Sequence, residues 1–309
     1  MAVLDQDAAQ VIAMLDAAGG FAIAGMTPGD IRARMAAAPR MPGRAVHEVG
    51  DHRVAVGGGE SIGARVYRPS TLVNLPVLVW FHGGGMVIGD LESADWVCRE
   101  LCVQAGYVVI SIDYRLAPEH KFPTAVEDAY AAVVWVVDNA AMLGVDACRL
   151  SVGGDSAGGT CAAVACLMAQ ARGGPAILAQ LLVYPGVDRD LTTVSAIEFA
   201  AGPLLTREAM LWFRGHYHSS DAEFGDWRAT PARAASHVGL PQACVLTAEI
   251  DPIRDAGEAY GALLARAGVM VRFKRYAGVF HGFFTIGPMI GKTVAAVGDA
   301  ARFLREVAG

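Results

Sequence analysis

The chain has 309 residues, of which 54% are hydrophobic and 18% charged, and its formal net charge is −6. This length and apolar content allow one large α/β domain or two ordinary domains. A negative charge without any run of Lys or Arg argues against a protein that binds nucleic acid or an anionic membrane.

The longest purely apolar stretches, such as residues 129–137, are far shorter than the roughly 18 residues that a membrane-spanning helix needs. We therefore expect no integral membrane segment. Asp5 and Asp7 stand where a secretory signal would carry Lys or Arg, so we expect a cytoplasmic location.

Six cysteines show neither a C-x-x-C pair nor zinc-finger spacing to histidines. Two pairs, Cys98/Cys102 and Cys161/Cys166, fall inside predicted helices, where we interpret them as small buried hydrophobic residues. The cysteines therefore imply no metal site.

The first 40 or so residues read as helical, and nothing in them alternates like a strand. Thr27, Pro28 and Asp30 offer an N-cap, a first-turn proline and an acid at the third position of a second helix. Strand-like segments follow at about 45–56 and 61–68. The glycines at 57–59 between them predict an antiparallel hairpin.

From Pro76 onward, continuous apolar strands alternate with helices. The strands are expected at 77–81, at 108–112, in the segment that leads into Ser156, and at 177–184, with helices at about 92–105, 124–140 and 157–172 between them. Strands buried on both faces and joined by helices form a parallel sheet, whose ligand site lies at the carboxyl ends of the strands.

This alternation stops between about 188 and 236, where a helix is expected at 206–217. An insertion of this size after a strand is typical of a cap over the site. Its His216 and His218 would suit a metal pair or, as the ordinary alternative, solvated histidines at a helix end. The core pattern then resumes with a strand at 243–247, a helix at 254–267, a strand at 270–276 and a helix at 292–307.

Gly154, Ser156 and Gly158 form a G-x-S-x-G motif between a strand and an Ala-rich helix. Small flanking residues permit a turn so sharp that the serine hydroxyl is exposed as a nucleophile, and the amide of Ala157 is left free at the helix N-terminus. Taken alone, the glycines could instead form a phosphate loop or a simple turn, although the spacings of nucleotide motifs are missing.

A second glycine motif, His82-Gly83-Gly84-Gly85, ends the first buried strand. Glycines bring bare backbone amides towards a ligand, so Gly84 and Gly85 are candidate oxyanion donors together with Ala157. The two motifs in one chain are much more specific than either alone.

A serine nucleophile needs a histidine base that a carboxylate orients, in the chain order Ser, acid, His. His281 follows the last predicted strand, and Glu249, Asp251 and Asp255 follow the strand before it. We rank Asp251 first. With that strand ending at Thr247, a first-turn Pro252 would place Asp251 at a helix N-cap and out of the α region.

Five stretches together closely resemble the bacterial hormone-sensitive-lipase-like esterases, from about Arg65 to the C-terminus. They are His82–Gly85, Asp113–Pro123, Gly154–Gly159 with Asp155 and Ser156, Asp251–Asp255 and His281–Phe283. The chain differs at Ala256, where many relatives carry Glu, which puts a salt bridge in doubt rather than the chemistry.

The resemblance implies an α/β-hydrolase fold, carboxylesterase activity and no cofactor. Ser156 matches the nucleophile, Asp251 the acid and His281 the base, and Gly84, Gly85 and Ala157 match the oxyanion donors. We expect N-terminal helices at residues 1–42 that are part of a cap, and a cap insertion at residues 188–236. The hydrolase core would then consist of two parts, residues 43–187 and 237–309.

We therefore predict a serine carboxylesterase that hydrolyses short-to-medium acyl esters through an acyl-enzyme intermediate. Its partner would be a small-molecule ester, with no nucleic acid, and a homodimer is one option for its assembly. A lactonase, amidase or acyltransferase would use the same triad. A non-catalytic ligand receptor on this fold is the other alternative, but it would need a broken triad.

Overall fold

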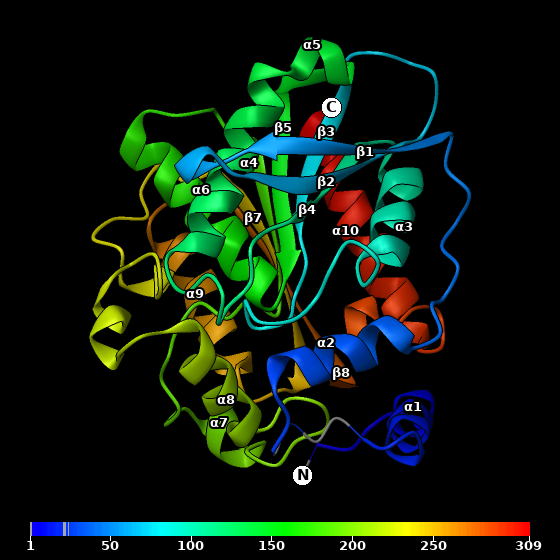
Figure 1. Cartoon of the computed structure of the whole chain (residues 1–309), viewed down its shortest axis with the longest axis vertical. Coiled ribbons are helices and arrows are strands. Elements are labelled where there is room, and N and C mark those ends of the chain that lie inside the picture. The colour runs from blue at the N-terminus through cyan, green and yellow to red at the C-terminus, as the bar shows by residue number, and fades with distance from the viewer. Residues whose placement is uncertain (1, 21–22, 24) are drawn as a thin grey trace.

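The computed structural model describes residues 2–20, 23 and 25–309. Its centre is an eight-stranded sheet of order β1-β2-β4-β3-β5-β6-β7-β8 (Figure 1). The strands are β1 (Glu48–Ala55), β2 (Ser61–Arg68), β3 (Leu75–Phe81), β4 (Val108–Asp113), β5 (Val145–Asp155), β6 (Ala179–Val183), β7 (Gln242–Ile250) and β8 (Val271–Phe280).

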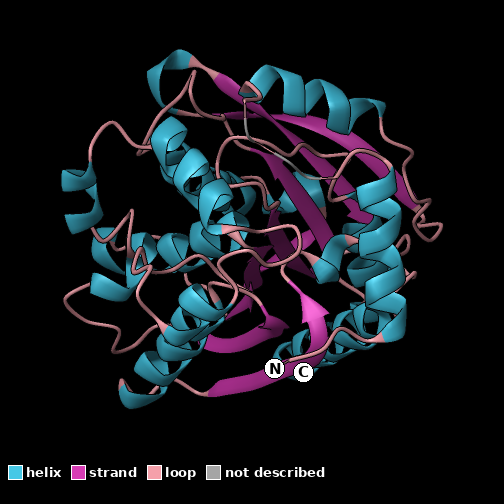
Figure 2. Ribbon diagram, turned by 90° about the horizontal axis from the view of Figure 1, so that it is seen from below, coloured by secondary structure: helices cyan, strands magenta, loops and turns pink. Residues whose placement is uncertain are grey.

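The helices in the described residues lie on both faces of this sheet and at one end of it (Figure 2). They are α1 (Gln6–Ala17), α2 (Pro28–Ala37), α3 (Asp95–Ala105), α4 (Thr124–Asp138), α5 (Ala140–Leu143), α6 (Ala157–Arg172), α7 (Val194–Glu198), α8 (Arg207–Tyr217), α9 (Arg254–Arg266) and α10 (Gly291–Ala308).

The pairing of the strands follows the sequence pattern. β1 and β2 form the predicted antiparallel hairpin, with Gly58 at a φ of 79° in its turn. β2 also pairs antiparallel with β4, and every later pairing is parallel. The carboxyl ends of β3, β5, β7 and β8 therefore face the same edge of the sheet.

Two apolar layers hold the sheet, one on each face. Successive side chains of a strand point to opposite faces. In β3, Val77 and Val79 accordingly join the layer formed with α4, α6 and α9, whereas Leu78 and Trp80 join the layer formed with α3 and α10. Both faces are thus covered, which explains why the strands lack polar alternation.

The predicted second helix, α2, begins as expected. The Thr27 hydroxyl accepts the Asp30 amide at 3.2 Å, and the Asp30 carboxylate accepts the Thr27 amide at 2.9 Å, which together form a capping box. α1 is anchored to β8, because the Asp5 amide donates to the Gly278 carbonyl at 2.8 Å. In Figure 1 both helices lie at the same end of the molecule as α7 and α8.

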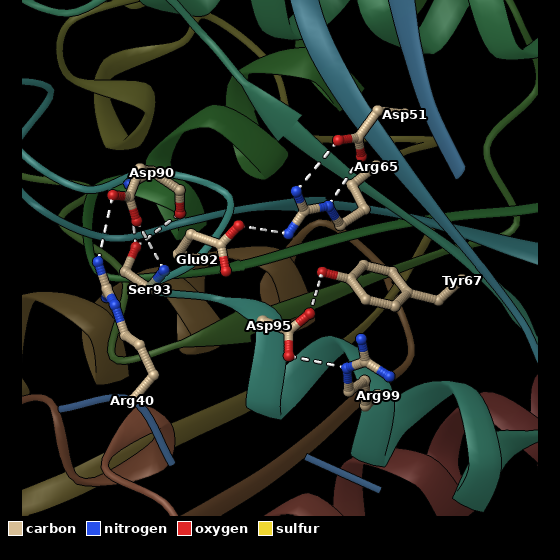
Figure 3. Close-up of polar contacts among 9 residues, drawn as sticks. All are labelled: Arg40, Asp51, Arg65, Tyr67, Asp90, Glu92, Ser93, Asp95 and Arg99. Carbon is tan, nitrogen blue, oxygen red and sulfur yellow. Dashed lines mark hydrogen bonds and ion pairs between the residues drawn. The ribbon is translucent and has the colours of Figure 1, made fainter. Parts of the chain in front are cut away.

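A network of charged side chains fixes the segment between β3 and α3 (Figure 3). Arg65 of β2 pairs with Asp51 of β1 at 2.8 Å and with Glu92 at 2.7 Å. Asp95 at the start of α3 accepts the Tyr67 hydroxyl at 3.0 Å and pairs with Arg99 at 2.7 Å. Exposed pairs of this kind contribute about 0–1 kcal/mol each, so their main effect is to position this segment.

Two predicted boundaries were wrong. β7 extends to Ile250 instead of ending at Thr247, and β8 extends to Phe280 instead of Tyr276. In both cases the pairing of β7 with β8 continues past the predicted strand end, with a register shift between Ala248 and Ile250. The insertion also contains α7, which the sequence analysis did not predict.

Cys98 and Cys102 lie in α3, and Cys161 and Cys166 in α6, all buried as predicted. Within the described residues there is no cluster of His, Cys, Asp and Glu that could hold a metal ion.

No helix among the described residues is long and apolar enough to cross a membrane.

Candidate active site

Ser156 lies on the turn between β5 and α6, with a φ of 54° that side chains rarely adopt. The two flanking glycines make this turn sterically possible. A Cβ on Gly158 would lie 1.9 Å from the Phe81 carbonyl oxygen, and one on Gly154 would lie 2.4 Å from the Gly158 backbone. The turn therefore raises the serine side chain above the carboxyl edge of the sheet.

The three residues predicted for catalysis come together at this edge. His281 directly follows β8, and its Nε2 lies 2.9 Å from Ser156 Oγ. Its Nδ1 lies 2.8 Å from Oδ2 of Asp251, which directly follows β7 and is completely buried. This is the arrangement that lets an imidazole accept a hydroxyl proton while a carboxylate holds its orientation.

The two rival carboxylates face elsewhere. Glu249 lies within β7, and its Oε2 accepts the Gly278 amide at 2.8 Å. Asp255 pairs with Arg254 at 2.9 Å, as expected of a surface salt bridge, and also accepts the Ser195 amide of α7 at 2.7 Å. Neither is a hydrogen-bond partner of His281 in the described structure.

Asp251 is held by a different local contact from the one predicted. α9 begins only at Arg254, with Ile253 as its N-cap residue, so Asp251 is not the N-cap. Instead its Oδ1 accepts the Ile253 amide at 2.9 Å. This short-range bond leaves Oδ2 free for the histidine, and the side chain keeps the orientation that the N-cap argument required.

Gly84, Gly85 and Ala157, whose amides are the candidate oxyanion donors, line one cavity together with Ser156. Gly84 and Gly85 have φ values of 112° and 64°, which only glycine adopts readily. The amides of Val87 and Ile88 both donate to the Gly84 carbonyl at 3.0 Å and hold this loop. Within the described residues none of the three candidate donors has an acceptor, so all three remain available to a ligand oxygen.

The other motif residues support this loop. Oδ1 of Asp155 accepts the Gly83 amide at 3.0 Å, and burial raises the pKa of Asp155 to about 6, while the charge of His281 opposes that rise. His82 is buried, stacks on Tyr114 at 4.3 Å, and its carbonyl accepts the Tyr114 hydroxyl at 2.8 Å. These contacts join the β3 loop to the nucleophile turn.

The cavity over Ser156 has a volume of about 330 Å³ and a largely apolar lining. Leu15, Ile23 and Met35 come from the N-terminal segment, and Met210 and Phe213 come from α8. Phe213 packs directly on the loop that carries Gly84 and Gly85, because a Cβ on Gly85 would meet its ring at 2.4 Å.

Sequence reasoning missed three arginines near this site. Arg32 of α2 donates a hydrogen bond to the Val87 carbonyl in the loop after β3, and Arg189 and Arg214 line the cavity itself. Arginines are common in surface segments, and a local sequence pattern does not reveal partners that lie many residues away. His218 also differs from the solvated histidine proposed: it is buried, and its Nδ1 lies 3.0 Å from Glu223, which leaves no metal pair with His216.

A parallel sheet with a serine on its strand-to-helix turn, backed by a histidine and an aspartate from later strands, defines an α/β hydrolase. Comparison with known proteins agrees with this class. Residues 78–285 match the family described as the alpha/beta hydrolase fold, and the chain belongs to this family. The fold predicted from the motifs is thus confirmed.

Several relatives and solved structures are named as esterases. The chain is 42% identical over 272 residues to "Carboxylic ester hydrolase LipN" of Mycobacterium tuberculosis. The matched region covers 86% of this chain and 72% of the relative. It is 39% identical to "Esterase LipI" of the same organism, over 90% and 88% of the two chains. This agrees with the esterase family that the sequence motifs resemble.

The structural likeness extends over nearly the whole chain. An esterase of Pyrobaculum calidifontis superposes with a TM-score of 0.91 at 41% identity, covering 99% of both chains. A thermostable esterase of Pseudomonas putida superposes with a TM-score of 0.94 at 36% identity, covering 99% of this chain and 98% of the other.

Proposed function

We propose that the protein is a serine carboxylesterase that hydrolyses short-to-medium acyl esters through an acyl-enzyme. The observation that carries this proposal is the continuous chain of contacts from Ser156 through His281 to Asp251, at 2.9 and 2.8 Å. The similarity to proteins named esterases supports the ester as the bond that is cleaved.

In the first half-reaction, Ser156 Oγ attacks the ester carbonyl carbon while His281 Nε2 takes its proton. The tetrahedral intermediate collapses, the alcohol leaves with that proton, and the acyl group stays on the serine. In the second half-reaction, water attacks the acyl carbon while His281 takes its proton, and the second tetrahedral intermediate then collapses. The acyl–serine bond breaks, the carboxylic acid leaves, and His281 returns the proton to Ser156 Oγ. The carboxylate of Asp251 stabilises the imidazolium in both halves.

The negative oxygen of each tetrahedral intermediate would be bound by the amides of Gly84, Gly85 and Ala157. Backbone donors that are already in place cost no reorganisation when charge develops, and removing a single such donor typically costs about 10²–10³ in turnover. The hydrogen bonds of Val87 and Ile88 to Gly84, and of Asp155 to Gly83, keep these donors in position.

We propose that residues 1–42 and 188–236 form a cap over the core at 43–187 and 237–309. Side chains from both segments line the cavity that contains Ser156. The two segments also contact each other, because Trp212 of α8 donates its indole N–H to the Met26 carbonyl at 3.3 Å. The apolar lining and modest volume of the cavity favour short-to-medium acyl chains.

The alternatives from the sequence have unequal support. Lactone or amide hydrolysis and acyl transfer would use the same residues, and substrate panels distinguish them. The intact triad argues against a ligand receptor, which needs no such geometry. A cytoplasmic location and a homodimer stay predictions.

The test is direct labelling of the nucleophile. We expect release of p-nitrophenol from p-nitrophenyl acetate, and stoichiometric loss of that activity on treatment with a serine-directed organophosphate. Mass analysis of the inactivated protein is expected to place the adduct on Ser156. An adduct on another residue, or full inactivation without any adduct, would contradict the proposed mechanism.

Arg32 is a positioning residue in this proposal. Its Nε donates to the Val87 carbonyl at 2.8 Å and its Nη2 to the Ala117 carbonyl at 2.6 Å, while Glu119 pairs with it at 2.9 Å. The amide of Val87 in turn donates to the Gly84 carbonyl. Arg32 therefore connects helix α2 to the loop that holds the oxyanion donors.

We expect Arg32→Met to lower kcat on p-nitrophenyl acetate by about 10- to 100-fold, because displacement of a catalytic group by about 1 Å has effects of that size. KM should change much less, since Arg32 does not line the cavity. Arg34→Met, on the exposed side of the same helix, is the matched control. Equal kcat values for the two variants would show that the loop does not depend on Arg32.

A further inference from the structure

Two arginines of the segment 188–236 line the cavity of Ser156 without any carboxylate partner among the described residues. Nε and Nη2 of Arg189 donate to the Ala229 carbonyl at 3.1 and 2.9 Å. Nη2 of Arg214 donates to the Arg189 carbonyl at 2.6 Å, and its guanidinium lies over the Phe224 ring at 5.6 Å. By contrast, Arg228 in the same segment pairs with Asp226 at 2.7 Å.

The surroundings of both guanidinium groups disfavour the charged form and lower its pKa. Burial and, to a smaller extent, the positive charge of Arg214 lower the pKa of Arg189 to about 10. Burial lowers the pKa of Arg214 as well. Desolvated cations are normally paired, because an uncompensated charge in a protein interior costs free energy. Both guanidinium groups are partly buried in the cavity lining, and an anionic group of a ligand would therefore stabilise them.

The other polar groups of this region lie near the two guanidinium groups without pairing with them. Asp188 is the acid next to Arg189 that lines the cavity, and its Oδ1 already accepts the amides of Arg189 and Asp190 at 2.6 and 3.2 Å. His218 lines the cavity too, but burial and the charge of Arg189 lower its pKa to about 4, so it is neutral. Asp221, Asp188 and Asp190 also act on Arg214 from a distance and oppose the effect of burial on its pKa, but none of them forms an ion pair with Arg189 or Arg214 within the described residues.

A neutral donor lies in the same lining. The Tyr217 hydroxyl is buried and has no hydrogen-bond partner in the described part of the chain. Burial raises the pKa of Tyr217 well above its usual range, so its proton stays available for donation. Arg189 is close enough to affect that pKa. The hydroxyl itself has almost no accessible surface, so Tyr217 adds polarity next to Arg189 rather than a direct contact to a ligand.

We propose that the substrates are esters that carry a carboxylate group, which Arg189 and Arg214 bind inside the cavity. The planar guanidinium fork matches the two oxygens of a carboxylate. This inference rests on the proposed esterase function, which it extends by naming the substrate class. Arg189 and Arg214 would then determine specificity by holding the charged end while the ester bond lies at Ser156.

The experiment compares charged esters with neutral amides of the same length. One pair carries the charge on the acyl side: monoethyl adipate and ethyl adipamate. The other carries it on the alcohol side: 4-acetoxybutanoate and 4-acetoxybutanamide. Hydrolysis is followed by acid release at constant pH. We expect kcat/KM of the wild type to favour the carboxylate in at least one pair by about tenfold or more, as charge-assisted hydrogen bonds do.

Arg214→Met and Arg189→Met should bring that preference ratio close to one or below it. The ratio is measured within each variant, so a general loss of activity does not change it. Because Arg189 also holds the Ala229 carbonyl, Arg214→Met decides the result if Arg189→Met does not fold. Arg207→Met is the matched control: it removes the same charge from the exposed start of α8, outside the cavity lining, and should keep the wild-type ratio.

The failure of this inference is distinct from the failure of the esterase proposal. Hydrolysis of the neutral amide esters without any preference for a carboxylate in either pair would overturn the anion site and leave the esterase intact. A preference that persists in both cavity variants would overturn it too. Absence of ester hydrolysis in all four compounds and in p-nitrophenyl acetate would instead contradict the esterase function itself.

Discussion

Replacement of Ser156 by Ala is expected to leave a folded protein with about a millionfold lower turnover, the size of effect found when a serine protease loses its nucleophile. The change removes only the hydroxyl that lies 2.9 Å from His281 Nε2. No other described group replaces it, so only the much weaker catalysis by oxyanion donors and binding would remain.

The measurement is kcat for p-nitrophenyl acetate, with circular dichroism to establish that the variant is folded. Ser93→Ala provides a matched control, since Ser93 lines the same cavity and its hydroxyl bonds only to the Asp90 turn. That variant should retain at least a tenth of the activity. If Ser156→Ala retained more than about 1% of wild-type turnover, Ser156 would not be the nucleophile.

Asp251→Asn should lower turnover by about 10⁴ while preserving the fold, the magnitude known for a serine protease whose histidine is left in the wrong tautomer. The amide has nearly the shape of the carboxylate, so Oδ1 can still accept the Ile253 amide. What it loses is the negative charge at the atom 2.8 Å from His281 Nδ1.

Glu249→Gln and Asp255→Asn are the natural controls, because both carboxylates lie within four residues of Asp251. Glu249 bonds to Gly278, and Asp255 bonds to Ser195 and Arg254, so their amides should reduce turnover by less than about tenfold. Turnover of all three variants would be measured side by side. A collapse of either control with less than tenfold loss in Asp251→Asn would reverse the assignment.

The contacts of Asp255 give it a structural role that the sequence did not indicate. Its carboxylate accepts the Ser195 amide at 2.7 Å, and its own amide donates to the Ser195 hydroxyl at 3.1 Å. The same hydroxyl donates to the Pro252 carbonyl at 3.1 Å. Helix α7 is thereby fastened to the segment that directly follows Asp251, the residue proposed as the acid of the triad.

Local patterns in the sequence determined most of the fold. Apolar runs with helices between them indicated the parallel strands, and glycines indicated the hairpin turn. The motifs around His82 and Ser156 identified the candidate site, because steric requirements at a sharp turn restrict the residue types there. His281 followed from the chemistry, since a serine nucleophile needs a base on a later strand.

Only the tertiary structure decided what depends on distant partners. Local reasoning ranked Asp251 first among the three acids, but it placed the strand end and helix start wrongly, and only the fold showed the bond to His281, thirty residues away. The same holds for the arginines. Arg32 has partners 55 and 85 residues away, and Arg189 and Arg214 line one cavity with Ser156 only in the folded chain. A sequence pattern reports on neighbours along the chain, whereas the charge balance of a cavity depends on groups that folding alone brings together.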